Sequence, residues 1–296
     1  MSLCCCPAAA RRFLLTPLFF GRRRHDQVRY STLHPSPLAT ARAASPVVAS
    51  SSFSPSQQRQ VSLYVDALLD WNQRMNLTAV TDEDEVMTRH VADSLAVLPS
   101  IERAYRAHSV SSSGSGDMEG MRLIDVGSGA GLPGLILAVA RPGWKFTLLE
   151  SMRKRCTFLE HAVEVMGLSN VDILCDRAEN VGQSPDFRES FDVAVARAVA
   201  ELKVLEIKPS ILLIAEYCLP LVRVDGLFIA AKGHDPHEEI KSAESAVHKL
   251  GASMLEICDV ESMGPHGQRT AVVYLKERIT PKKYPRHPGT PSKMPL

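Results

Sequence analysis

The sequence predicts an α/β protein with a central, mainly parallel sheet that is preceded by helices. Two observations carry this prediction. Strand-length apolar segments alternate with helical segments through the second half of the chain, which is typical of βαβ units with buried strands. The last two strand-like segments lie too close together for a helix to fit between them, so they should pair antiparallel. The chain has 296 residues, of which 45% are hydrophobic, and this composition is ordinary for a globular protein.

Seven segments are expected to be strands. The five that helix-like stretches separate are 121–126, 145–150, 171–175, 191–198 and 226–233. The last two, 253–262 and 269–277, flank the short connection "MGPHGQ" and should form the hairpin. A mainly parallel sheet that ends in an antiparallel hairpin is the class I methyltransferase variant of the Rossmann-like fold.

The part of the chain before the sheet predicts helices. Residues 57–80 place apolar side chains at helical spacing, which indicates an amphipathic helix. A second helix is expected over 81–104, where Thr81 precedes a run of acidic residues that favours a helix start. The expected organisation is a helical segment 57–108, a flexible linker 109–120, the sheet domain 121–277 and a basic C-terminal tail 278–296.

Residues 1–56 differ in composition from the rest. The first 60 residues hold eight arginines, no lysine and one acidic residue, Asp26, among many serines, alanines and prolines. Arg-rich, Ser-rich and acid-poor composition is typical of an organelle transit peptide, although a merely disordered tail is the alternative. The extended Ser/Pro/Ala content favours the chloroplast stroma over the mitochondrion.

Charge and cysteine usage limit the possible partners. Without its first 60 residues the chain keeps 26 basic and 32 acidic residues, so it is no general polyanion binder and would need local patches to contact nucleic acid. The four cysteines beyond the N-terminal segment are isolated, without the spacing of zinc ligands. No apolar run reaches the roughly 18 residues of a membrane helix. We therefore expect no metal, no membrane and a monomer.

The glycine cluster "DVGSGAGLPG", residues 125–134, follows the first strand and opens a helix-like run. Its G-x-G-x-x-G spacing matches dinucleotide-binding loops, but this pattern alone is weak. Asp125 at the strand end would repel a pyrophosphate, and Pro133 removes an N–H from the helix entrance that would bind an anion. The tight turn should begin at Gly127, with Gly129, Gly131 and Leu132 following.

S-adenosylmethionine fits this loop better than a nicotinamide cofactor does. It carries no phosphate, its ammonium and sulfonium groups favour a nearby carboxylate, and glycines let its amino-acid part approach the backbone. Glu150 ends the second strand, where a carboxylate can accept both ribose hydroxyls, although NAD enzymes share this feature. A nicotinamide cofactor, or a packing loop without ligand, remains the alternative.

Several further motifs together resemble one family. From about residue 60 to the end, the chain resembles the bacterial small-subunit rRNA guanine-N7 methyltransferases (the RsmG, or GidB, family). The matching stretches are "LLDWNQRMNLTAV", "RHVADSLAV", "DVGSGAGLPGLILA", "ESMRKRCTFL", "DRAENV", "DVAVARAVA", "IAAKG" and "KYPRHPGTPSKMPL". The combination of the first two with the last is more specific than the glycine loop. The resemblance implies transfer of a methyl group from S-adenosylmethionine to N7 of a guanine in small-subunit (16S) rRNA.

The resemblance also implies site residues. Contacts to the methyl donor are implied for Gly127, Leu132, Ala178, Glu179 and Arg197. Ala178 and Glu179 follow the third strand, where loops that contact adenine lie in such sheets. Arg197 ends the fourth strand; we expect it to act in catalysis and to face RNA phosphate or the donor's carboxylate rather than to be buried. A surface ion pair is the alternative for this arginine.

Basic residues outside the loop are candidates for RNA contact, with solvated surface charge as the alternative. One group, Arg89 and His90 with Asp93, lies in the second predicted helix and is also a candidate for an active-site role, although Arg89 and Asp93 at i, i+4 could instead form a surface pair. The remaining candidates follow the second strand or lie in the tail: Arg153, Lys154, Arg155, Lys282, Lys283, Arg286 and Lys293.

Guanine N7 has a lone pair and no proton at neutral pH, so we expect no general base. We expect a desolvated slot for the guanine between the end of the fourth strand and the N-terminal helices. The sequence departs from the family at 206–214, "EIKPSILLI", where Pro209 should break a helix and Ile207, Ile211, Leu212, Leu213 and Ile214 should add exposed apolar surface. A SAM-binding ribosome-assembly factor without catalysis, and less so a NAD-dependent oxidoreductase, are the alternative functions.

Overall fold

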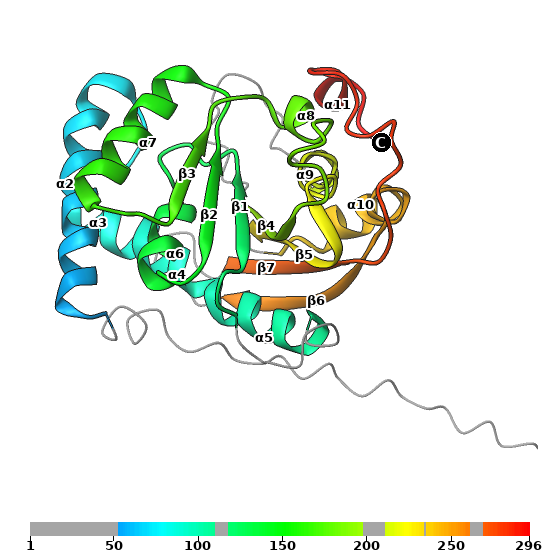
Figure 1. The fold of residues 1–296 in the computed structure, drawn as a ribbon, viewed down its shortest axis with the longest axis horizontal. Helices are drawn as coiled ribbons and strands as arrows, with labels where there is room; N and C mark the ends of the chain where they lie inside the picture. The colour runs from blue at the N-terminus through cyan, green and yellow to red at the C-terminus, as the bar shows by residue number, and fades with distance from the viewer. Residues whose placement is uncertain (1–52, 110–117, 198–210, 234, 261–268) are drawn as a thin grey trace, which may run out of the picture. The chain divides into compact units, whose positions relative to one another are not determined.

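The computed structural model describes residues 53–109, 118–197, 211–233, 235–260 and 269–296. Its seven-stranded sheet has the order β3-β2-β1-β4-β5-β7-β6 (Figure 1). The strands are β1 (Arg122–Val126), β2 (Lys145–Leu149), β3 (Val171–Leu174), β4 (Phe191–Arg197), β5 (Val222–Lys232), β6 (Ala252–Val260) and β7 (Arg269–Lys276). The helices are α2 (Pro55–Met75), α3 (Glu83–Val86), η1 (Met87–Val91), α4 (Ala92–Ala96), α5 (Leu98–Ser109), α6 (Gly134–Ala140), α7 (Arg153–Met166), α8 (Ala178–Val181), α9 (Ile211–Cys218), α10 (His237–Lys249) and α11 (Thr290–Lys293).

The sheet confirms the predicted fold class. Strands β1 to β5 pair in parallel, whereas β7 is antiparallel to both β5 and β6. The chain moves outward from β1 to β2 and β3 and then returns to place β4 on the other side of β1. This change of direction is a topological switch point, and ligands of doubly wound folds bind outside the carboxyl ends of the strands there.

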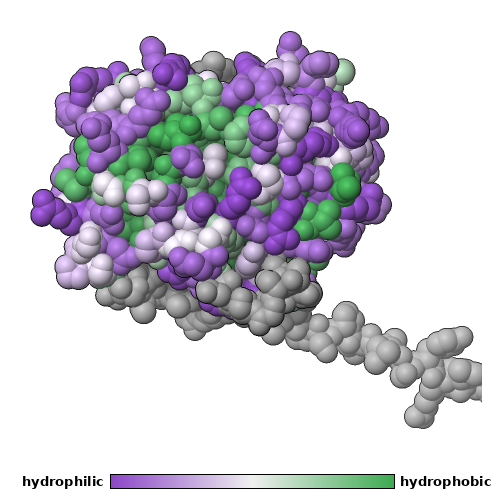
Figure 2. All heavy atoms as spheres, in the orientation of Figure 1, coloured by the Kyte–Doolittle hydropathy of each residue, from purple (hydrophilic) through white to green (hydrophobic). Residues whose placement is uncertain are grey.

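Helices cover both faces of the sheet. One core joins α2, α6 and α7 to the sheet through buried residues such as Tyr64, Leu135 and Phe158. The second core lies on the opposite face, where Ile211 and Ala215 of α9 pack among buried residues of β4 and β5. The edge strand β3 keeps its apolar residues only partly covered. Figure 2 correspondingly shows hydrophobic residues in the region where Figure 1 shows β2 and β3.

Helix α9 corrects one expectation about the insertion at 206–214. Ile211 and Ile214 were expected to be exposed but are buried in the second core, and Leu212 is partly buried against it. Ile207 and Pro209 lie outside the described residues. Ile211 and Ile214 are therefore core residues, because they lie on the inner face of a helix that covers the sheet, whereas Leu212 and Leu213 are partly buried.

The helices before the sheet differ from the prediction in their boundaries. Helix α2 starts at Pro55, where Ser54 and Gln57 form a capping box. The single helix expected over 81–104 is instead α3, the π-helical turn η1, α4 and α5, and its N-cap is Asp82 rather than Thr81. A π turn carries one more residue than a regular turn, so the residues after it are rotated about the axis relative to an uninterrupted helix. Most of the expected linker, 110–117, and the segment 1–52 lie outside the described residues.

The C-terminal tail is anchored to the sheet domain. The guanidinium of Arg188 donates hydrogen bonds to the carbonyls of Gly182, Thr280 and Tyr284 at 2.6–2.8 Å. Arg286 binds Glu216 of α9 through two guanidinium contacts of 2.9 and 2.7 Å, and Glu216 is fully buried. A fork-shaped pair to a buried carboxylate fixes the tail in one position.

None of the helices within the described ranges has the length and apolar character that a membrane crossing requires.

Replacement of Arg286 by alanine should destabilise the fold. The change leaves the carboxylate of Glu216 buried without its partner, and breaking such a pair lowers the free energy of unfolding by about 3 kcal/mol. Urea unfolding measures the effect. The matched variant Lys282→Ala, at an exposed position in the same tail, should change stability by less than about 0.5 kcal/mol. Equal stabilities of the two variants would contradict the anchoring role.

Candidate functional site

The glycine loop lies at the switch point, between β1 and α6. Gly127, Gly129 and Gly131 have φ angles of 75°, 58° and 85°, in the left-handed region that favours glycine. The amide of Gly127 donates to the carbonyl of Leu149 at 2.8 Å, which ties the loop to the end of β2. An added Cβ at Gly127 would meet no atom within 4 Å, so the space beside this residue is open to a ligand.

Asp125 does not face that space. Its carboxylate is fully buried under the loop and accepts the amide of Gly134, the first residue of α6, at 2.9 Å. Burial raises the pKa of Asp125 to about 6, and the hydrogen bond from Gly134 and the charge of Arg197 oppose this rise. Pro133, the N-cap residue, has no N–H. The start of α6 therefore has its first amide occupied from within the protein, which disfavours a phosphate there.

Glu150 connects the loops after β1 and β2. One of its carboxylate oxygens accepts the amide of Gly129 at 3.0 Å, and the other accepts the amide of Met152 at 2.8 Å. These bonds hold the carboxylate at the carboxyl edge of the sheet, beside the open space at Gly127. Arg155 lies 3.7 Å from the same carboxylate, so this predicted RNA contact points toward the loop. Its neighbours Arg153 and Lys154 are exposed at the start of α7.

Ala178 and Glu179 form the first turn of α8, directly after β3. Glu179 is buried, and its carboxylate accepts the amide of Gly289 from the tail at 3.0 Å. Leu132 is also buried. The predicted donor-binding residues therefore lie in loops at the carboxyl ends of β1 to β4, along one edge of the sheet. The structure adds the tail to this edge, which the sequence did not indicate.

Arg197, which was expected to face RNA phosphate or the donor's carboxylate rather than to be buried, ends β4 and is partly buried. Burial lowers the pKa of its guanidinium, while the hydroxyl of Tyr64 and the carboxylates of Asp125 and Asp93 act in the opposite direction. Tyr64 itself is fixed by a 2.9 Å hydrogen bond to the carbonyl of Ala130. The arginine is thus held between acidic groups of β1 and α4 rather than on the surface.

A narrow slot lies beside Arg197, between the end of β4 and the N-terminal helices, where the sequence analysis expects the guanine. Three basic side chains and one acidic side chain line it together with apolar residues. The lining residues are Asp93, Val97, Arg197, Ala231, Lys232, Val260, Arg269 and Thr270. Lys232 forms an ion pair with Glu239 at 2.6 Å. Arg269 forms one with Asp93.

The structure separates the members of the predicted Arg89, His90 and Asp93 group. Arg89 pairs with Glu85 at 3.5 Å, whereas Asp93 pairs with Arg269. His90 contacts the hydroxyl of Thr78 at 2.7 Å. Burial, and next the charge of Arg197, lower the pKa of His90 to about 4. A neutral imidazole of this kind is no phosphate-binding cation, so His90 is a packing residue in this arrangement.

The tail candidates also divide. Lys282, Lys283 and Lys293 are exposed, whereas Arg286 is engaged with Glu216. The interpretation of Arg286 as an RNA contact therefore gives way to a structural role. Lys232, Arg269 and Tyr64 also belong to this site but were not predicted from the sequence. Two of these residues could have been found from the sequence. Lys232 ends the strand that contains "IAAKG" and Arg269 begins the last strand, and these two ends of antiparallel strands meet at this edge of the sheet.

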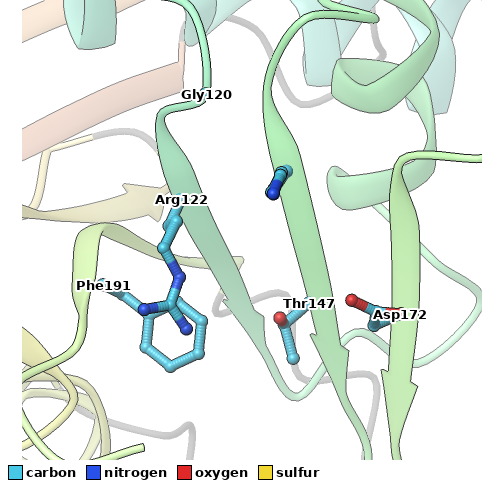
Figure 3. A pocket seen from close by; sticks show the side chains of 6 residues that line it. Gly120, Arg122, Thr147, Asp172 and Phe191 are labelled. Atoms are coloured by element: carbon cyan, nitrogen blue, oxygen red, sulfur yellow. The ribbon is translucent and has the colours of Figure 1, made fainter.

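A second hollow, of about 430 Å³, lies at the opposite edge of the sheet. Figure 3 shows Arg122 beside Phe191, with Thr147 and Asp172 on the neighbouring strands. The guanidinium of Arg122 stands 5.1 Å from the centre of the Phe191 ring. This hollow belongs to the beginnings of β1 and β2, so it is separate from the glycine loop. Within the described ranges, no group of three or more His, Cys, Asp or Glu is placed to bind a metal ion.

The model of the GidB family, described as rRNA small subunit methyltransferase G, matches residues 57–266. The chain belongs to this family. Ribosomal RNA small subunit methyltransferase G of Symbiobacterium thermophilum is 44% identical over 241 residues, which cover 80% of this chain and 89% of that protein. The proteins of the same name from Moorella thermoacetica and Alkaliphilus oremlandii are 40% and 43% identical, and each is covered over 91% of its length. The resemblance to the GidB family is thereby confirmed.

Replacement of His90 by glutamine should change the pH dependence of stability in this GidB-family protein. The folded pKa of about 4 lies below the unfolded value of 6.5, so only the unfolded chain takes up a proton between these pH values. Acidification from pH 7 to 4.5 should therefore destabilise the wild type relative to the variant by about 2 kcal/mol. Urea unfolding at both pH values measures this shift. If the wild type and the variant differ in unfolding free energy by the same amount at both pH values, the burial of a neutral imidazole is contradicted.

Proposed function

We propose that this chain transfers the methyl group of S-adenosylmethionine to N7 of a guanine in the small-subunit rRNA of an organelle. Membership of the rRNA small subunit methyltransferase G family supports the reaction class. The observation that carries the proposal is the position of the slot at Arg197. It adjoins the end of β4, the strand next to β1 and its glycine loop. A substrate base in the slot therefore lies beside the donor site.

The residues at the switch point fit the methyl donor. Open space beside Gly127 admits the amino-acid part close to the backbone, and the carboxylate of Glu150 stands where ribose hydroxyls can donate to it. Ala178 and Glu179 bound the adjoining loop after β3. When bound, S-adenosylmethionine supplies a methyl group on a positively charged sulfur, which a neutral nucleophile can attack.

The protein's task is then positioning. Because guanine N7 has no proton at neutral pH, no side chain has to act as a base, in agreement with the neutral, hydrogen-bonded His90. The slot must exclude water and align N7 with the methyl group at roughly 3 to 3.5 Å. Arg197 lines the slot, and the carboxylates of Asp125 and Asp93 act on its charge. Its charge is balanced by these carboxylates.

The alternative of a NAD-dependent oxidoreductase loses its main support. A pyrophosphate needs free amides at the start of α6, but the amide of Gly134 is bound to Asp125 and Pro133 has none. The alternative of a SAM-binding assembly factor without catalysis rested on the insertion at 206–214. Ile211 and Ile214 of this insertion are core residues, so they give no reason to expect loss of activity.

The organelle part of the proposal rests on the N-terminal composition alone. The Arg-rich, acid-poor segment 1–56 is typical of a transit peptide, and its Ser/Pro/Ala content favours the chloroplast stroma over the mitochondrion. The substrate is then the small-subunit rRNA, or its ribosomal particle, in that compartment. The acidic charge of the remaining chain favours a structured particle over free RNA.

Disruption of the gene should abolish one N7-methylguanine in organelle small-subunit rRNA. Chain cleavage at N7-methylguanine after reduction maps the modification at nucleotide resolution. Wild-type protein should restore it, whereas Arg197→Ala should lower the methylation rate by about 100-fold or more, since a preorganised charge beside the reacting groups is lost. If the modified guanine persists in the disrupted line, the proposed reaction is wrong. If the Arg197→Ala variant restores the modification at the normal rate, Arg197 has no role in the reaction.

Gly127→Ala should weaken binding of S-adenosylhomocysteine by at least about tenfold, because the new methyl group occupies the space that the ligand needs. Gly120→Ala is a matched control: Gly120 has a similar φ of 77°, and a Cβ there also meets nothing within 4 Å. Both changes strain the backbone by about 1 kcal/mol, but only the first lies at the donor site. Calorimetric titration separates them, with NAD as a ligand that should not bind. Equal affinities in both variants would place the donor elsewhere.

A further inference from the structure

Asp93 has an unusual environment in the slot. Its side chain is only 2% exposed and faces Arg269 in an ion pair. Oδ2 contacts Nε of Arg269, whereas Oδ1 accepts no hydrogen bond from any group in the described part of the chain. Buried polar atoms are nearly always hydrogen-bonded, so a carboxylate at the wall of a slot with one oxygen unpartnered and the other held only by a movable arginine indicates a ligand that donates to it.

The chemistry of the slot suits guanine. Among the described residues that line it, Asp93 carries the one carboxylate, and Arg197, Lys232 and Arg269 carry positive charge. Guanine presents two adjacent donors, N1–H and N2–H, beside the acceptor O6. A carboxylate matches the donors, and a basic side chain matches O6. Adenine presents an acceptor at N1, which a carboxylate would repel.

Arg269 occupies the place of such a ligand. The slot has room for about 10 Å³, at most the space of a single water molecule, so no base enters without a side-chain movement. The N–H groups of a guanidinium and the N1–C2–N2 unit of guanine are alike in shape and in donor pattern. The Arg269 side chain, 19% exposed at the start of β7, can exchange with guanine at Asp93 without leaving the carboxylate unpaired.

We infer that Asp93 selects the target base, by accepting hydrogen bonds from N1–H and N2–H of guanine after Arg269 withdraws from the slot. This inference rests on the proposed function and names the residue that reads the substrate. Methylation at N7 places positive charge on the purine, which makes its N1–H a stronger donor. The contact therefore strengthens during the reaction, so it favours the transition state as well as binding.

The test uses the full-length protein and small-subunit particles that carry either guanine or inosine at the methylated position, which the rRNA mapping identifies. Inosine lacks only the N2 amino group. The wild type should methylate inosine about 10- to 100-fold more slowly than guanine, because inosine loses one hydrogen bond to a charged group. Asp93→Asn should slow methylation of guanine and bring the guanine-to-inosine rate ratio close to one, because the acceptor that distinguishes the bases is gone.

Arg269→Gln is the matched control. It removes the same ion pair but leaves the carboxylate, so it should keep the wild-type ratio. Calorimetric binding of S-adenosylhomocysteine shows whether each variant is folded. If Asp93→Asn does not bind it, Asp93→Glu is used instead. This variant keeps a carboxylate, so it should react more slowly but retain the guanine-to-inosine rate ratio. Equal wild-type rates on guanine and inosine, an unchanged ratio in Asp93→Asn, or a lost ratio in Asp93→Glu would overturn the role of Asp93. Absence of wild-type methylation on either particle would overturn the proposed function itself.

Discussion

A series of buried, alternating charges holds the site together. Asp125 of β1 and Asp93 of α4 both act on the guanidinium of Arg197 at the end of β4, and Arg269 of β7 forms an ion pair with Asp93. Asp125 and Asp93 are buried and the two arginines are partly buried, so removing one arginine leaves a buried carboxylate without its compensating charge. The series also joins the helices before the sheet to the strands at the switch point, which makes the N-terminal helices part of the site.

The fold was largely predictable, because it follows from local patterns. Strand-length apolar segments and the short connection "MGPHGQ" determine a parallel sheet with a terminal hairpin, and the sheet has that topology. The errors arose where tertiary contacts override local signals. The segment 81–104 has the composition of one helix, yet η1 interrupts it. Ile211 and Ile214 were assigned to the surface because a sequence does not show that a neighbouring sheet face requires cover.

The site was predictable in position but not in orientation. The strand-end rule placed Gly127, Glu150 and Arg197 along one edge, and they lie there. The rule says nothing about where a side chain points, so the burial of Asp125 and Arg197 was missed. Likewise, Arg286 and Lys282 look alike in the sequence. Only the position of Glu216 on a distant helix shows that the first is an internal ion-pair partner and the second is exposed.

The π turn η1 decides which residues of this segment face the sheet. Such a turn holds one residue more than an α-helical turn, and each residue of an α-helix advances about 100° around the axis. Deletion of a single residue from Met87–Val91 would turn Asp93 about a quarter of the way around its helix relative to the preceding residues, away from Arg197. The extra residue of the π turn thus sets the direction in which Asp93 faces the slot. Deleting one residue from this segment should therefore harm the site more than most substitutions within it.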